Sequence, residues 1–261
     1  MSEDIREVVR EKYGAIAEGR PSGTGCCGGS CGTDVLTEIG YSAEQASAIP
    51  EGANLGLGCG NPLALAEVKP GETVLDLGSG AGIDCFLAAR EVGPTGRVIG
   101  VDMTPAMLAK ARANATKVAE ANIEFRLGEI EHLPVADSSV DLIISNCVIN
   151  LSPDKPQVFR EAFRVLKPGG RLLVSDLVLT RPLTLEMQKS VDLYIGCVAG
   201  ASMKEEYLGM MREAGLASVE VLNESRYDVG VDSLPADSPE RAAFDSVVSV
   251  KVGAVKPIRA C

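Results

Sequence analysis

The stretch Val74-Leu-Asp-Leu-Gly-Ser-Gly-Ala-Gly-Ile83 decides how this chain folds. A short apolar run with one carboxylate leads into three glycines at every second position, and these lead into residues 83–90, a second largely apolar segment. The pattern predicts a strand, a tight turn and a helix whose first backbone N–H groups can face a ligand. Its GxGxG spacing is one residue shorter than the GxGxxG turn that binds a dinucleotide pyrophosphate, so the motif alone also fits a glycine-rich turn without a ligand.

Strands and helices alternate after this turn. The predicted strands are residues 74–77, 97–101, 122–127, 140–145, 171–175, 219–222 and 247–252. The predicted helices are residues 3–18, 62–67, 83–91, 105–121, 154–166 and 203–214, and residues 232–241 are expected to form a loop. Ser202 and Glu205 have the spacing of a capping box at the start of the last helix. Alternation with short connections predicts an α/β fold with a doubly wound, mostly parallel sheet.

Composition narrows the classes of function. The 261 residues are 46% hydrophobic, which is enough to bury a large core. The net charge of −11, without a basic cluster, argues against a nucleic-acid partner. No run of 18 apolar residues exists and the first residues are charged, so we expect no membrane span and no signal peptide. The predicted protein is a cytoplasmic monomer.

Eight cysteines in a reducing compartment indicate ligand or redox duties rather than disulfides. Cys26, Cys27 and Cys31 lie in a glycine-rich segment, residues 20–33, which could also be a solvent loop with incidental thiols. A closed zinc site needs a second close pair of ligands, and none follows within the usual window.

Asp102 ends the strand at residues 97–101, twenty residues after Gly82, where a carboxylate can accept hydrogen bonds from ribose hydroxyls. With the glycine turn and the Gly128-Glu-Ile130 segment, it makes residues 68–179 resemble the class I S-adenosylmethionine-dependent methyltransferases. The segment Lys167-Pro-Gly-Gly170 is also typical of that family.

The resemblance implies a Rossmann-like sheet of seven strands and S-adenosylmethionine as methyl donor. It divides the chain into an N-terminal helical and Cys-rich arm (residues 1–66), the cofactor-binding core (67–180) and a C-terminal α+β region that covers the substrate and adds the last strands (181–261). The cofactor contacts that it implies are Asp76, Gly78, Ser79, Gly80, Gly82, Asp102, Met103, Gly128, Glu129, Ile130 and Asn146.

Cysteines are the reactive side chains that we expect at the catalytic edge of the sheet. Cys147 directly follows the fourth strand, and Cys59 and Cys197 lie in glycine-flanked positions, so the three could converge on one soft ion. They could equally be buried apolar residues around an organic substrate. Cys85, on the helix after the glycine turn, is expected in the core, and His132 is a weak candidate for a general base.

Three segments narrow the resemblance: Leu57-Gly-Cys-Gly-Asn-Pro62, Ser145-Asn-Cys-Val-Ile-Asn150 and Tyr194-Ile-Gly-Cys197 are similar to those of the arsenite methyltransferases, over residues 8–252. The resemblance implies that Cys59, Cys147 and Cys197 bind trivalent arsenic as substrate. It also implies that an N-terminal cysteine, with Cys31 at the best spacing, takes part in binding or in a disulfide relay.

The implied reaction is methylation of arsenite, or of its thiol conjugates, in arsenic detoxification. The arsenic lone pair attacks the methyl group, so no general base is needed, and good orientation can supply roughly 7–11 kcal/mol of the barrier. A thiol reductant, glutathione or a thioredoxin-like partner, would return arsenic to the trivalent state. Two alternatives stay open: a carbon methyltransferase acting on a quinone or sterol, and a metalloid-binding protein without turnover.

Overall fold

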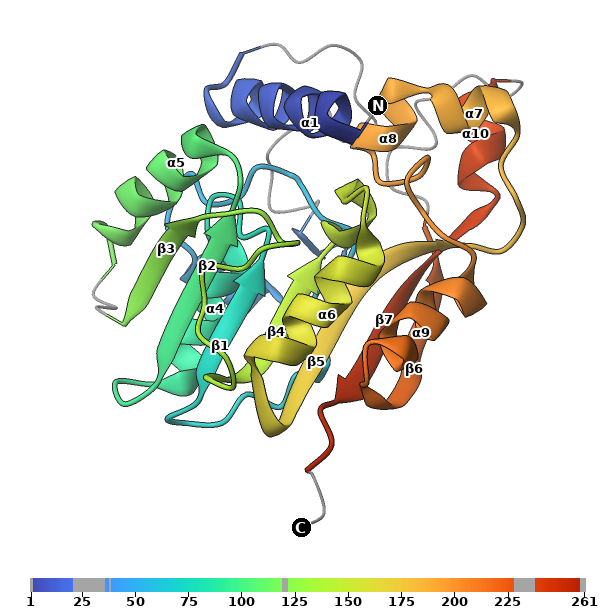
Figure 1. Cartoon of the computed structure of the whole chain (residues 1–261). Coiled ribbons are helices and arrows are strands. Elements are labelled where there is room, and N and C mark those ends of the chain that lie inside the picture. Colours follow the sequence, from blue (N-terminus) through green and yellow to red (C-terminus); the bar gives the residue numbers. More distant parts are fainter. Residues whose placement is uncertain (1, 21–35, 38, 119–121, 228–237, 259–261) are drawn as a thin grey trace.

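A computed structural model describes residues 2–20, 36–37, 39–118, 122–227 and 238–258 (Figure 1). Its centre is a seven-stranded sheet in the order β3-β2-β1-β4-β5-β7-β6, in which only β7 runs antiparallel to its neighbours. The strands are β1 Thr73–Leu77, β2 Arg97–Asp102, β3 Ile123–Leu127, β4 Val140–Asn146, β5 Leu166–Leu179, β6 Ala217–Arg226 and β7 Val247–Val255. The predicted doubly wound, mostly parallel sheet is confirmed.

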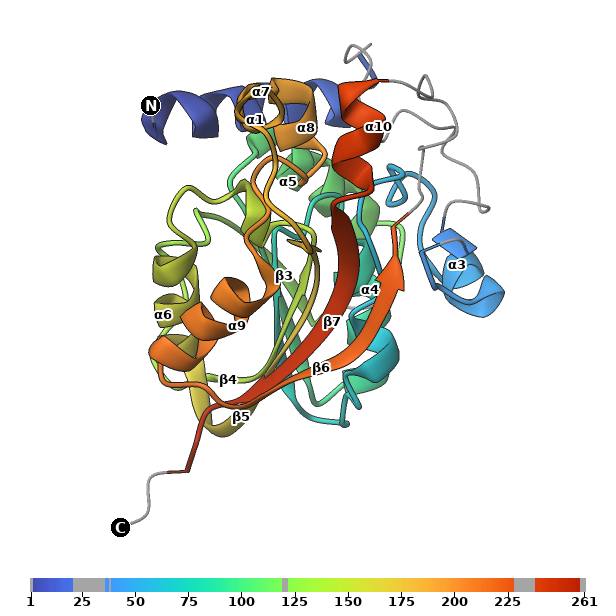
Figure 2. The ribbon, with the colours of Figure 1, turned by 90° about the vertical axis from the view of Figure 1, so that its right-hand side faces the viewer.

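Helices cover both faces of the sheet. They are α1 Ser2–Ala17, α3 Ala43–Ala48, α4 Ile83–Val92, α5 Pro105–Ala115, α6 Lys155–Val165, α7 Leu185–Lys189, α8 Val191–Ile195, α9 Lys204–Glu213 and α10 Pro239–Phe244, with 3₁₀ helices η1 Leu63–Leu65 and η2 Ile149–Leu151. One apolar core lies between the sheet and α6 and α9, and another lies between the sheet and α4 and α5. Figure 2 shows α6 and α9 on one side of the strands and α4 on the other.

The carboxyl ends of β1, β2 and β4 meet at one edge of the sheet, and α1 and α8 lie above that edge (Figure 1). A third apolar cluster, which includes Val9 of α1, Leu193 of α8 and Leu177 of β5, joins these helices to the sheet. Strands from residues 67–180 and from residues 181–261 share the one sheet, so the division of the chain into three regions stays a prediction.

Several element ends differ from the prediction for reasons of tertiary structure. Helix α9 begins at Lys204 without a side-chain cap, because residues 202 and 203 extend the sheet instead: Leu179 N bonds to Ser202 O and Leu179 pairs with Met203. The expected capping box is therefore wrong. Strand β5 starts at Leu166 rather than at residue 171, because Leu166 already pairs with Val140 of β4 and residues 167–170 form an irregularity before Arg171 pairs with Leu142.

Two other helix expectations were also wrong. Helix α5 ends at Ala115 rather than near residue 121. Thr116 N and Lys117 N donate hydrogen bonds to carbonyls of its last turn. Residues 239–241, expected in a loop, belong to α10, because the Ser238 side chain caps it and Pro239 suits its first turn. Residues 228–237 lie outside the described part. None of the described helices has the length and apolar character that crossing a lipid bilayer requires.

We predict that Gly100→Ala destabilises the fold by about 1–3 kcal/mol, because it overpacks the face of β2 under α4. A Cβ at Gly100 would lie 2.8 Å from Phe125 and 2.9 Å from the Cys85 sulfur. Gly209 in α9 is the matched control: its Cβ would meet no atom within 4 Å, so Gly209→Ala should stabilise by about 0.5–1 kcal/mol. Urea unfolding measures both, and equal stability of Gly100→Ala and the parent would contradict the packing argument.

Candidate active site

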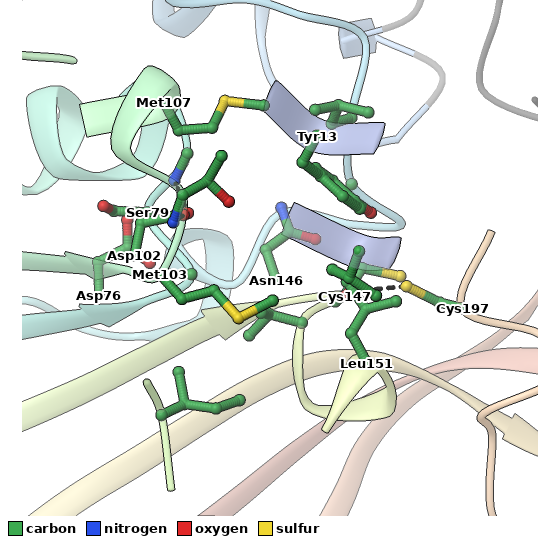
Figure 3. Close-up of a pocket in the computed structure, with 18 of the residues that line it drawn as sticks. Tyr13, Asp76, Ser79, Asp102, Met103, Met107, Asn146, Cys147, Leu151 and Cys197 are labelled. Atoms are coloured by element: carbon green, nitrogen blue, oxygen red, sulfur yellow. Dashed lines mark hydrogen bonds between the residues drawn. The ribbon is translucent and has the colours of Figure 1, made fainter. Parts of the chain in front are cut away.

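A cavity of about 1210 Å³, its open mouth included, lies at the carboxyl edge of the sheet (Figure 3). The glycine turn, Asp102 and Met103 line one part of it, and Cys147 and Cys197 line another. Side chains of α1 complete the wall, with Arg6, Val9 and Tyr13. The cavity therefore joins the predicted cofactor residues to two of the predicted thiols.

The three glycines of the turn have different roles. All have positive φ, at +67° for Gly78, +51° for Gly80 and +97° for Gly82. A Cβ on Gly80 would meet no protein atom within 4 Å, so this glycine leaves room for a ligand. A Cβ on Gly78 would clash with Val148, and one on Gly82 with Phe86 and Phe125. Gly82 does not line the cavity and serves packing instead.

Asp102 ties the turn to the end of β2. Its Oδ2 accepts a hydrogen bond from Gly80 N at 2.9 Å, and its Oδ1 accepts one from Thr104 N at 2.8 Å. Burial raises the pKa of Asp102, while these hydrogen bonds favour its ionised form. The carboxylate faces the cavity with its position already set by two backbone donors.

Asp76 and Ser79 also line the cavity. Burial raises the pKa of Asp76 well above its ordinary value, and the nearby Asp84 carboxylate raises it further. The Cys85 thiol donates to Asp76 Oδ2 at 3.2 Å and is fully buried, as expected for a core cysteine. Ser79 Oγ is buried without a hydrogen-bond partner among the described residues, which suits a donor or acceptor on a ligand.

The segment predicted beside adenine is placed in part at the cavity. Gly128 and Ile130 line it, but Glu129 faces Arg6 and Arg10 of α1 at 3.8 and 3.6 Å. The neighbouring acid, Glu131, lines the cavity instead, where it accepts hydrogen bonds from Arg6 at 3.0 Å and from Ser152 at 2.6 Å. The cofactor contact of Glu129 stays a prediction. His132 is exposed and outside the lining, so nothing in its position makes it a base.

The Asn146 side chain lines the cavity and also anchors the loop that carries Cys59. Its Oδ1 accepts from Cys59 N at 3.1 Å, and its Nδ2 donates to Gly60 O at 2.7 Å and to Tyr41 OH at 3.0 Å. An amide can donate and accept at once, which a carboxylate or an alkyl side chain cannot. The residue was predicted as a cofactor contact, and its observed hydrogen bonds hold the thiol loop.

Two of the predicted thiols, Cys59 and Cys147, lie together at the far end of the cavity, and Cys197 lies beside Cys147. The sulfurs of Cys59 and Cys147 and one carboxylate oxygen of Asp176 lie within 4.8 Å of one another. The Cys197 thiol donates to Cys147 O at 2.8 Å, drawn as a dashed line in Figure 3. Cys59 is buried behind the lining. Cys31, like Cys26 and Cys27, falls outside the described residues.

Backbone strain and burial mark the thiols as a specialised site. Cys147 has φ +57° and Cys197 has φ +63°, values that cost non-glycine residues about 1–3 kcal/mol and are kept mainly at functional sites. Burial raises the pKa of Cys59, and it raises the pKa of Cys147 well above its ordinary value, where both neighbouring thiols add to the effect. Both shifts favour the protonated forms of Cys59 and Cys147.

Sequence reasoning missed Asp176 and the α1 wall. Asp176 is the one acid in the apolar segment of β5, and burial raises its pKa to about 7 against the effect of hydrogen bonds from Leu177 N and Tyr207 OH. A charged residue in an otherwise apolar strand was the available signal. A helix over residues 3–18 was predicted, but its sequence could not show that Tyr13 OH donates to Ile195 O at 3.2 Å, two residues before Cys197.

We predict that Asn146→Ala exposes the Cys59 thiol. Each lost hydrogen bond is worth about 0.5–1.5 kcal/mol, so losing the bonds to Cys59 N and Gly60 O should raise thiol reactivity about tenfold or more. Alkylation followed by peptide mass spectrometry measures Cys59 separately from the other cysteines. Asn114→Ala is the control, because the Asn114 amide is also buried but donates to Ala81 O. Unchanged alkylation of Cys59 in Asn146→Ala would show that the amide does not hold the loop.

Comparison with known proteins agrees with this geometry. Residues 68–215 match a family described as a methyltransferase domain. The chain is 49% identical to the arsenite methyltransferase of Halobacterium salinarum, over 98% of this chain and 68% of the relative. It is 38% identical to that of Aquipseudomonas alcaligenes, over 93% of this chain and 70% of the relative.

The solved structures include an arsenic(III) S-adenosylmethionine methyltransferase from Chlamydomonas reinhardtii, with a TM-score of 0.66 and 35% identity over 85% of this chain and 73% of that one. The relatives, the sheet order and the glycine turn all point to one family, and this chain belongs to the arsenite methyltransferases, within the S-adenosylmethionine-dependent methyltransferases.

Proposed function

We propose that this chain transfers a methyl group from S-adenosylmethionine to trivalent arsenic held by Cys59, Cys147 and Cys197. One observation carries the proposal: a single cavity runs from the glycine turn and Asp102 to the converging thiols. The names of the relatives support the same reaction. Arsenic detoxification is the physiological role that follows from it.

The cavity residues fit the methyl donor. Gly80 leaves space beside the turn, Asp102 presents a fixed carboxylate for ribose hydroxyls, and Ser79 offers a hydroxyl without a protein partner. Gly128 and Ile130 provide an apolar edge for adenine. When bound, the donor supplies an electrophilic methyl group on a sulfonium sulfur. The protein's part is to bind this molecule with its methyl group toward the thiols.

The protonated thiols fit capture of neutral arsenite. Each sulfur that binds arsenic displaces one hydroxide, and the thiol proton leaves with that hydroxide as water. No net charge is buried, so the raised pKa values of Cys59 and Cys147 do not oppose loading. Thiolate sulfur is the ligand that a soft centre prefers.

The alternatives explain less of the site. A carbon methyltransferase for a quinone or sterol would use the same donor residues, but it gives no reason for two strained cysteines at the end of the cavity. A binding protein without turnover would need no cleft with an open glycine turn. The geometry therefore favours the arsenic reaction.

The proposal also requires a reductant. Transfer of the methyl group raises arsenic formally to the pentavalent state, and two electrons must restore the trivalent one. Small thiols such as glutathione, or a thioredoxin-like protein, have the right chemistry. Cys59, Cys85, Cys147 and Cys197 are all free thiols, which suits a reducing cytoplasm. A relay role for Cys31 and a monomeric state belong to the same proposal.

We expect Gly80→Val to abolish detectable binding of S-adenosylmethionine in calorimetry, because the new side chain would fill the space left for the ligand. Gly93→Val is the matched control: Gly93 also has positive φ, +65°, and an open surrounding, but it lies at the end of α4. Asp102→Ala should weaken binding about 100-fold or more through loss of the ribose contact and of the Gly80 anchor. Normal affinity in Gly80→Val would refute the assignment of the turn.

We expect Cys147→Ser and Cys197→Ser each to lower arsenite methylation about 100-fold or more, because two remaining sulfurs bind arsenic weakly and misalign it. Both variants should still bind S-adenosylmethionine. Cys85→Ser should lower stability more than rate, since Cys85 is a core residue that does not line the cavity. X-ray absorption of the arsenite complex should show three sulfur neighbours. A shell dominated by oxygen would rule out the thiol site.

A further inference from the structure

Asp176 is a buried acid beside the thiol cluster that the proposed reaction does not yet use. It is inaccessible to solvent, and one of its oxygens lies within 4.8 Å of the sulfurs of both Cys59 and Cys147. Arsenic bound to these two sulfurs would lie close to the same oxygen. The acid is thus placed to act on the reacting atom through its charge.

Three hydrogen bonds fix the Asp176 side chain in position. Oδ1 accepts from Asn150 Nδ2 at 2.8 Å and from its neighbour Leu177 N at 2.9 Å, and Oδ2 accepts from Tyr207 OH at 3.0 Å. All three donors are uncharged, and the Lys155 ammonium is a nearby positive charge that also favours the ionised form of Asp176. Burying an acid in this way costs stability, and such groups are found where their charge has a function.

The proposed methyl transfer moves a positive charge toward this carboxylate. The arsenic lone pair forms the new As–C bond, the S–C bond of the donor breaks, and its electron pair stays on the donor sulfur. The donor sulfonium becomes a neutral thioether, and the neutral trithiolate arsenic becomes a cation. The charge therefore arises on arsenic during the reaction and is absent when arsenite first binds.

We propose that Asp176 stabilises the positive charge that develops on arsenic during methyl transfer. This inference rests on the proposed function and adds to it a residue outside the sulfur ligands. A carboxylate already held by Asn150, Leu177 and Tyr207 does not have to reorganise as the charge appears, which is the condition for effective electrostatic stabilisation. Because neutral arsenite gains little from the same charge, Asp176 should affect the transfer step and not the binding step.

The test is Asp176→Asn, which keeps the shape and removes the charge. Arsenite affinity, measured by equilibrium dialysis, should stay within about twofold, while single-turnover methyl transfer slows about 10- to 100-fold.

Asp141→Asn is the matched control, because it removes the same charge on the neighbouring strand β4, where Asp141 accepts from Thr73 N and Lys167 Nζ and does not line the cavity. Its transfer rate should stay within about threefold of the parent. If Asp176→Asn does not fold, Asp176→Ala assayed with added formate or formamide gives the same information. The formate anion should restore the rate, and the neutral formamide should not.

Parallel losses of arsenite affinity in Asp176→Asn, or an unchanged transfer rate, would overturn the role of Asp176. Equal rescue by formate and formamide would do the same, because it would show that shape and not charge matters. A parent protein that binds arsenite and transfers no methyl group would instead refute the proposed function itself. The two failures are therefore distinguishable.

Discussion

The side-chain amide of Asn146 connects the parts of the site that come from distant segments. It stands at the end of β4, accepts from Cys59 N, and donates to Gly60 O and to Tyr41 OH. Tyr41 in turn donates to Asp84, the acid at the start of the helix that follows the glycine turn. A single polar side chain thus joins the thiol loop to the turn that shapes the cofactor end of the cavity. Two further hydrogen bonds hold Cys59: Ser249 Oγ donates to Cys59 O at 3.0 Å, and the Cys59 thiol donates to Ser175 O at 3.6 Å.

The proposed site must bind arsenite through sulfur and also keep a negative charge at Asp176, two requirements that could conflict. Holding three thiolates beside a carboxylate would concentrate negative charge in a place without solvent. The protonated thiols of Cys59 and Cys147 reduce this charge before binding, and in the proposed loading a neutral hydroxide of arsenic adds none. The charge of Asp176 then meets positive charge on arsenic only once methyl transfer begins. A buried thiol cluster is therefore compatible with the proposed reaction, because positive charge appears on arsenic only during methyl transfer and next to the Asp176 carboxylate.

Local patterns predicted the fold, because the deciding features are local. Glycines 78, 80 and 82 adopt positive φ within one turn, and apolar runs between short connections define the parallel strands. The predicted ends of helices and strands were wrong where distant segments pair. For example, Ser202 O accepts a hydrogen bond from Leu179 N, and the Ser202 side chain does not cap α9. The thiol convergence came from family resemblance, since nothing in the spacing of Cys59, Cys147 and Cys197 shows that they meet. Asp176 and the hydrogen bonds of Asn146 could not be predicted, because their partners are set by tertiary packing.

The left-handed backbone at Cys147 and Cys197 has a consequence for how this site can be lost. Glycine and asparagine adopt positive φ more readily than cysteine, so either would relieve strain at these positions. Neither carries sulfur. Random variants sorted only for heat resistance would therefore accumulate these replacements and lose the proposed arsenic ligands, whereas variants sorted for arsenite methylation would retain the cysteines. Selection for thermal stability and selection for arsenic methylation therefore favour different residues at positions 147 and 197.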